Sequence, residues 1–178
     1  LHFFTADPLI TNKPISMFLL LLIVAFQAYL SIRNKSQAFA ALAVLFLLTA
    51  TIVSDTALFY LPLLIAAAAG ATIYLLRFAW KSLFVITLIL TYTGFSVWIL
   101  GDPVMGHPVK LITEKYLGVI CLFSLGAIYS VVLLFRDKDA LSNDYLIGVT
   151  ITNGILFTLL LLFIVFSFFS AGYVTLFA

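Results

Sequence analysis

The side chains best suited to chemistry lie in and beside the longest polar break of the chain, residues 101–113. They are Asp102, His107 and Glu114, with His2 and Asp55 expected on the same side of the molecule. An imidazole together with carboxylates supplies the donors that ligate zinc or act as general acid and base. However, their spacings match no metal-binding signature, and an ordinary loop explains them. We therefore predict no metal site, no cofactor and no catalytic residue here.

Two rows of small and polar residues recur at helical spacing within apolar segments. One row is Thr87, Thr91, Gly94 and Trp98, and the other is Thr150, Asn153, Gly154 and Thr158. Residues three, four, seven or eight positions apart share one face of a helix. Each row could line a polar path for a substrate, or form helix–helix contacts in which Thr and Asn bond across the interface. We favour contacts for both rows, and Asn153 is the residue most worth testing for a further role.

The other candidates also indicate packing. Gly126 and Ser130 are small residues four positions apart, and Cys121 lies nearby in an apolar run, where a thiolate is disfavoured. The chain has no Gly-rich phosphate loop, no HExxH, no GxSxG with His partners and no paired Asp in adjacent helices. No segment outside the apolar runs is large enough to form a catalytic domain. We therefore predict a protein that is not an enzyme.

The elements that carry these residues are set by composition. Hydrophobic residues make up 65% of the chain and charged residues 9%, against about 45–50% and about 25% in soluble domains. Apolar segments cover residues 15–32, 37–53, 57–76, 82–100, 116–135 and 146–169, and another begins at Ala171. Segments of this kind approach the length of about 20 residues that a helix needs to cross a bilayer. The sequence predicts an all-α polytopic transmembrane bundle of about six spanning helices plus the start of a seventh.

The chain also has the features of an internal piece. It starts at Leu1 without Met and stops at Ala178 inside the last apolar segment. We expect residues 1–178 to be a single transmembrane domain cut from a longer chain. Ser142 or Asn143 could cap the segment at 146–169. The alanine-rich block at residues 66–71 is smooth, so we expect another helix to approach it closely.

The predicted spans contain no Asp, Glu, Lys, Arg or His. Ionisable residues inside a bilayer usually mark proton relays, ion paths or counter-ions. Their absence argues against a proton- or cation-coupled transporter whose coupling site lies wholly within these segments. A carrier of lipid or other apolar cargo stays possible.

Basic residues predict the orientation of the chain. Alternate connections place Arg33, Lys35, Arg77, Lys81, Arg136 and Lys138 on one side, and Lys13, Lys110 and Lys115 on the other. Because Lys and Arg concentrate on the cytoplasmic side, the first set is expected inside and the N-terminus outside. Aromatic belts are expected at Tyr29, Trp80 and Tyr145 on the inner boundary, and at Tyr60, Trp98 and Tyr116 on the outer one. The inner cations could touch anionic lipid headgroups, although orientation alone explains two per turn.

The stretch RFAWKSL at residues 77–83, followed by Thr91 and Trp98, resembles a family of predicted multi-pass bacterial membrane proteins called domain of unknown function 2339. In that family a basic-Trp-x-x-Leu turn opens a helix that ends in another Trp. Residues 60–76 and 153–157 also look similar, and the likeness covers residues 36–178. The resemblance implies a bacterial inner-membrane protein of which this chain is an internal piece. It implies no catalytic residues, because the family has no established activity.

Taken together, these patterns favour an integral membrane protein that is structural or assembles with partners. The alternative is a transporter or flippase for a weakly charged or lipid-like substrate. The expected partners are the lipid bilayer and either other helices of the same longer chain or partner membrane proteins. A net charge of +2 with no dense basic patch argues against nucleic acid.

Overall fold

The computed structural model describes residues 13–53, 57–101, 115–135 and 141–169, and all regular secondary structure in these ranges is helical. The helices are α1 (Lys13–Asn34), α2 (Gln37–Val53), α3 (Ala57–Phe78), α4 (Lys81–Ile99), α5 (Lys115–Ser130) and α6 (Asn143–Ile164). A 3-10 turn, η2 (Val131–Phe135), extends α5, and a π-helical turn, η3 (Val165–Phe169), extends α6. The prediction of an all-α fold is therefore confirmed. The segment beginning at Ala171 lies outside the described residues.

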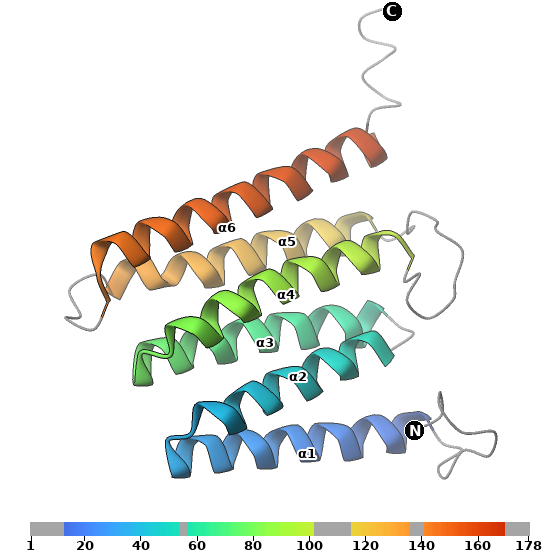
Figure 1. The fold of residues 1–178 in the computed structure, drawn as a ribbon. Coiled ribbons are helices and arrows are strands. Elements are labelled where there is room, and N and C mark those ends of the chain that lie inside the picture. The colour runs from blue at the N-terminus through green and yellow to red at the C-terminus, as the bar shows by residue number, and fades with distance from the viewer. Residues whose placement is uncertain (1–12, 54–56, 102–114, 136–140, 170–178) are drawn as a thin grey trace, which may run out of the picture.

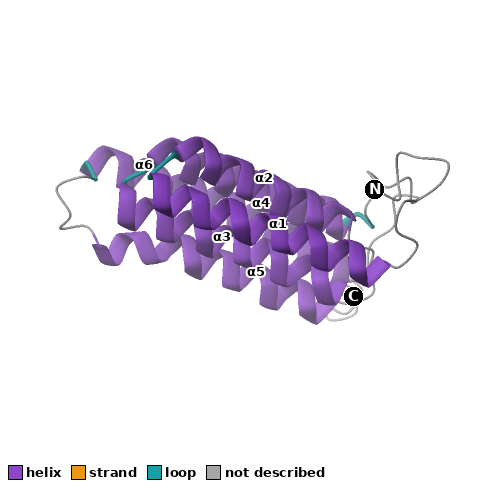
Figure 2. Cartoon of the chain, turned by 90° about the horizontal axis from the view of Figure 1, so that it is seen from below, coloured by secondary structure: helices purple, strands orange, loops and turns teal. Residues whose placement is uncertain are grey.

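The six α-helices run side by side in alternating directions (Figures 1 and 2). α3 lies in the interior and packs against α2, α4 and α5, whereas α1 and α6 occupy opposite margins of the bundle. Apolar stretches long enough to cross a membrane are found at Phe59–Phe78, Lys81–Ile99, Tyr116–Leu134 and Asn143–Ser167. The apolar stretches described in α1 and α2, Phe18–Asn34 and Gln37–Thr51, are shorter. Four helices can thus span a bilayer by length and composition, and the predicted count of six stays a prediction.

Two hairpins are closed by connections of only two residues at the same end of the bundle, on the left of Figure 1. α1 turns into α2 at Lys35, which has a φ of 47°, and α3 turns into α4 at Ala79, which has a φ of 56°. In the first turn the amide of Ser36 donates to the carbonyl of Ser31, 3.2 Å away. In the second the amide of Ala79 donates to the carbonyl of Leu75, 2.8 Å away. The residue that follows a helix in this left-handed conformation is usually glycine. Lys35 and Ala79 carry side chains, so their backbone conformation is disfavoured in both turns.

The third helix at this end begins with an ordinary cap. Ser142 is the N-cap of α6, and its hydroxyl accepts from the amide of Tyr145, 3.4 Å away. This decides between the two capping residues that the sequence allows. The cap satisfies one of the free amides at the start of a helix, which fixes where α6 begins.

The core lies along α3 and α4. Its largest fully buried side chains are Tyr60, Leu64 and Leu75 of α3, Phe84, Leu88, Tyr92, Phe95 and Ile99 of α4, Leu122, Leu125 and Tyr129 of α5, and Ile164 of α6. In the alanine-rich block, Ala67, Ala68 and Ala71 are buried, as expected for close approach. Ala66 is exposed and Gly70 half-buried, so the other side of the same block is open. Pro62 is exposed within α3, which continues through it.

Candidate functional site

A buried set of hydroxyl and amide groups joins α4, α5 and α6. Its first contact links Thr91 of α4 to Tyr129 of α5, whose hydroxyl oxygens lie 2.7 Å apart. Phe84 meets the ring of Tyr129 edge to face, with centroids 5.4 Å apart. Both members of the pair are 1% exposed or less. A hydroxyl removed from water in this way needs a partner. Thr91 and Tyr129 are partners of each other, and the hydroxyl of Thr91 also bonds to the carbonyl oxygen of Leu88, 3.0 Å away.

Asn153 of α6 makes the second and larger contact. Its Oδ1 accepts from the hydroxyl of Tyr92 at 2.7 Å. Its Nδ2 lies 3.3 Å from the carbonyl oxygen of Gly126 and 3.3 Å from Oγ of Ser130, and donates to both. One amide therefore bonds to α4 on one side and to α5 on the other.

Close contact between α5 and α6 brings these groups within reach. A Cβ added at Gly126 would lie 2.8 Å from Cδ2 of Phe157, so only glycine lets α6 come this near. Phe157 also meets Phe123 edge to face at 5.2 Å between centroids. The predicted small pair Gly126 and Ser130 thus sits at the contact between the two helices.

The two predicted rows have different surroundings. On α4, Thr87 and Thr91 are fully buried and Trp98 is 5% exposed. The hydroxyl of Tyr60 donates to the carbonyl oxygen of Gly94, 2.9 Å away. The row on α6 is divided: Asn153 is buried within the bundle, whereas Thr150, Gly154 and Thr158 are exposed.

This arrangement supports contacts rather than a polar path. The hydroxyl of Thr87 donates to the carbonyl of Leu83 in its own helix at 2.8 Å, and that of Thr150 donates to Leu146 at 2.7 Å. Hydroxyls bonded one turn back are already satisfied and offer little to a passing solute. The cluster of Thr91, Tyr129 and Asn153 has its partners inside the bundle. It can hold helices together, and it contains no group that ionises readily near neutral pH.

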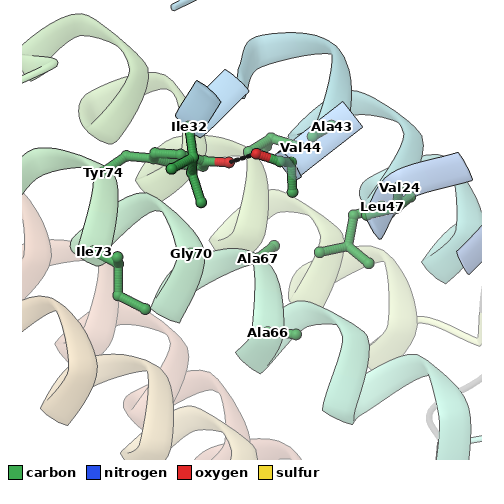
Figure 3. A pocket seen from close by; sticks show the side chains of 11 residues that line it. Val24, Ile32, Ala43, Val44, Leu47, Ala66, Ala67, Gly70, Ile73 and Tyr74 are labelled. Carbon is green, nitrogen blue, oxygen red and sulfur yellow. Dashed lines mark hydrogen bonds between the residues drawn. The ribbon is translucent and has the colours of Figure 1, made fainter. Parts of the chain in front are cut away.

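A groove elsewhere in the bundle is lined almost entirely by apolar groups (Figure 3). It lies between α1, α2 and α3 and has a volume of about 230 Å³. Its lining residues are Val24, Ala28 and Ile32 of α1, Ala43, Val44 and Leu47 of α2, and Ala66, Ala67, Gly70, Ile73 and Tyr74 of α3. At one end the hydroxyl of Tyr74 lies 3.5 Å from the carbonyl oxygen of Ala28. The space beside Gly70 is open, because a Cβ added there would meet nothing within 4 Å.

The end of the bundle that holds the tight turns is basic. Arg33, Lys35 and Arg77 are exposed there. Nζ of Lys81 lies 5.5 Å from the ring centroid of Tyr145, which directs this cation toward α6. Arg136 and Lys138, the third predicted pair, lie outside the described residues. So do Asp102, His107 and Glu114 of the predicted outer connection, together with His2 and Asp55.

Beside these turns, three aromatic rings stack. The ring of Trp80 lies 5.4 Å from that of Tyr74 and 4.8 Å from that of Phe78, centroid to centroid. The stack joins the turn between α3 and α4 to the groove, since Tyr74 belongs to both. Trp80 is half-buried, in keeping with a boundary position.

Tyrosine hydroxyls are the interhelical contacts that sequence reasoning missed. The expected outer belt included Tyr60 and Trp98, but these are 1% and 5% exposed and their rings lie 6.5 Å apart inside the bundle. Tyr116, at 77% exposed, is the member of that set that faces outward. Tyr92 and Tyr129 fall within apolar segments, where lipid supplies no hydrogen-bond acceptor. A tyrosine hydroxyl inside an apolar segment was therefore the sequence feature that could have indicated a hydrogen bond to another helix.

Comparison of the chain with protein families, with curated proteins and with solved structures finds no match.

Proposed function

We propose that this chain is a non-enzymatic integral membrane protein that assembles with other transmembrane helices through α6. The observation that carries the proposal is the outward side of α6. Only 17% of its apolar stretch is buried in the bundle, against 50% for those of α3 and α4. The exposed apolar side chains on this helix are Ile147, Ile151, Ile155, Leu159, Leu162 and Phe163.

Lipid alone could cover an apolar face, so the small residues on it are the more specific feature. Thr150, Gly154 and Thr158 are all exposed and recur every four positions, which aligns them along one flank of α6. A Cβ at Gly154 would meet nothing within 4 Å. Lines of small residues at this spacing let two membrane helices approach closely. The fitting partner is therefore another membrane helix, from the rest of a longer chain or from a partner protein.

Cysteine crosslinking in membranes tests this proposal. A Thr158→Cys variant in a Cys121→Ser background, carrying a short thiol-attached photocrosslinker, should give a discrete crosslinked species on illumination. That species is larger when the partner is another protein, and is an internally linked form when the partner is another helix of the same chain. Adding Gly154→Leu should reduce that species about tenfold, because the added side chain keeps the helices apart. Gly148→Leu is the matched control, since Gly148 is also exposed with open space around it but lies about 120° away around the helix. Equal crosslinking in both leucine variants, or no crosslinked species of either kind, would refute assembly through this flank.

The proposed location is the bacterial inner membrane, with the basic turns in the cytoplasm. Arg33, Lys35 and Arg77 at one end of the bundle support this orientation through the excess of Lys and Arg on cytoplasmic sides. The resemblance to the bacterial membrane family supports the same location.

Labelling of single cysteines with an impermeant thiol reagent in intact cells tests the orientation. Cysteines would replace Ser36, Ser82, Met105 and Ser142 in the Cys121→Ser background. Labelling at position 105 alone is expected. Labelling at any of the other three positions would show that the orientation or the number of spans is wrong.

A further inference from the structure

We propose that the groove between α1, α2 and α3 binds one anionic phospholipid, with an acyl chain in the groove and the phosphate at its basic end. This goes beyond the proposed assembly through α6, which involves the opposite margin of the bundle (Figure 1).

The groove has the shape and lining that a hydrocarbon chain requires. On α1, Val24, Ala28 and Ile32 recur every four residues and form one wall along the helix. On α3, the small residues Ala66 and Gly70 line the groove and leave room for an occupant (Figure 3). Its volume of about 230 Å³ exceeds the roughly 150 Å³ of an apolar cavity that stays dry and takes up benzene. Water would find almost no polar partner along this lining, so a hydrocarbon occupant is favoured.

The groove, at about 230 Å³, is smaller than the roughly 400–600 Å³ that one turn of a protein helix fills. A helix with its side chains is about 10–12 Å across, and α1 and α3 are bridged at one end by the contact of Tyr74 with Ala28. A single flexible chain can enter a space of this kind where a helix cannot. Of the apolar occupants that a membrane offers, a lipid acyl chain is the one that fits.

Charge selects the lipid. α1 and α3 both run toward the basic end, where Ile32 is followed by Arg33 and Tyr74 is followed three residues later by Arg77. Arg77 lies four residues after Ile73 and seven after Gly70, so it continues the groove face of α3. Among the residues that the structure describes, the acidic one is Asp144, at the start of α6 on the other margin. The guanidinium of Arg77, on the groove face of α3 at the basic end, complements a phosphate whose acyl chain lies inside the groove.

Native mass spectrometry of the detergent-purified chain tests the proposal. The protein would be offered equal amounts of dioleoyl phosphatidylglycerol and dioleoyl phosphatidylcholine. One bound phosphatidylglycerol per chain is expected, favoured about fivefold or more because each nearby cation contributes about that factor. Gly70→Leu should abolish this adduct by filling the groove, and Gly148→Leu should leave it unchanged. Ala66→Leu, at an exposed lining position, is the second filling variant should the first fail to fold.

The headgroup contact is tested separately. Arg77→Gln should lower the preference for phosphatidylglycerol about fivefold while keeping one bound lipid. Lys81→Gln is the control, because that cation lies over Tyr145 and away from the groove. Equal binding of both lipids, or adducts that survive both filling variants, would overturn the proposal in favour of general lipid contact. A dimer that is lost in Gly70→Leu would overturn it in favour of a second copy of the chain. Because neither filling variant touches α6, failure here leaves the crosslinking result for α6 independent.

Discussion

Replacing Asn153 with leucine should lower the free energy of unfolding by about 2–3 kcal/mol. The two bonds from Nδ2 to Gly126 and Ser130 contribute about 0.6 kcal/mol each, as interhelical bonds in membranes do. Both acceptors keep another bond, because Oγ of Ser130 donates to the carbonyl of Gly126 at 2.8 Å. The larger part comes from the hydroxyl of Tyr92, which loses its acceptor at 2.7 Å. A buried donor left without a partner costs about 1–2 kcal/mol.

A double-mutant cycle isolates that contact. Tyr92→Phe alone should cost about 1 kcal/mol, because it leaves Oδ1 of Asn153 unpaired. In the Asn153→Leu background, Tyr92→Phe removes a hydroxyl that has already lost its acceptor, so stability should rise rather than fall. The coupling free energy should be about 2 kcal/mol, within the range for residues in one hydrogen-bonded network.

The assay is reversible unfolding in mixed detergent micelles, followed by far-ultraviolet circular dichroism. Thr150→Val is the control, because its hydroxyl bonds within its own helix and the side chain is exposed. Its effect should stay within about 0.5 kcal/mol of zero. If the double variant loses as much stability as both single variants together, the contact between α4 and α6 does not contribute as described.

Two further changes test the turns and the close helix contact. Ala79→Gly should raise stability by about 0.5 kcal/mol, because relief of the left-handed backbone outweighs the added freedom of the unfolded chain. Ala66→Gly, at an exposed position inside α3, should instead lower stability by about 1 kcal/mol. Equal losses in thermal melts would contradict the account of the turn. Gly126→Leu should cost about 3 kcal/mol through its clash with Phe157, whereas Gly148→Leu should be nearly neutral in the same unfolding assay. Recovery of part of the loss when Phe157→Ala is added to Gly126→Leu would identify the clash as the cause, and an unchanged deficit would exclude it.

The helices were predictable because apolar runs end where charges begin. The sequence predicts helical segments at 37–53 and 57–76, and α2 and α3 occupy 37–53 and 57–78. Basic residues and the capping Ser142 likewise mark helix termini, and the structure brings these termini together at one end of the bundle. These sequence signals are local, and each can be recognised without knowing which helices are neighbours.

The inward faces were harder to predict. A helix that is apolar all round carries little pattern to show which side is buried. The rows on α4 and α6 have similar composition and spacing, yet Thr87 is fully buried and Thr158 exposed. Tyr60 near a segment end resembles a boundary residue, but its hydroxyl donates to the carbonyl oxygen of Gly94 in the neighbouring helix. Such placement follows from the approach of two helices, which no single segment encodes.

The two-residue hairpin turns have a consequence for the order in which the bundle forms. A connection this short holds the ends of α1 and α2, and of α3 and α4, within about 10 Å of each other as soon as they exist. Loop closure then takes little entropy, and each pair can close while the chain is still being synthesised. α5 is different, because it packs on α3 as well as on α6, and α4 lies between α3 and α5 in sequence. The first four helices should therefore associate early in folding, and docking of α5 onto α3 should be the later and slower event.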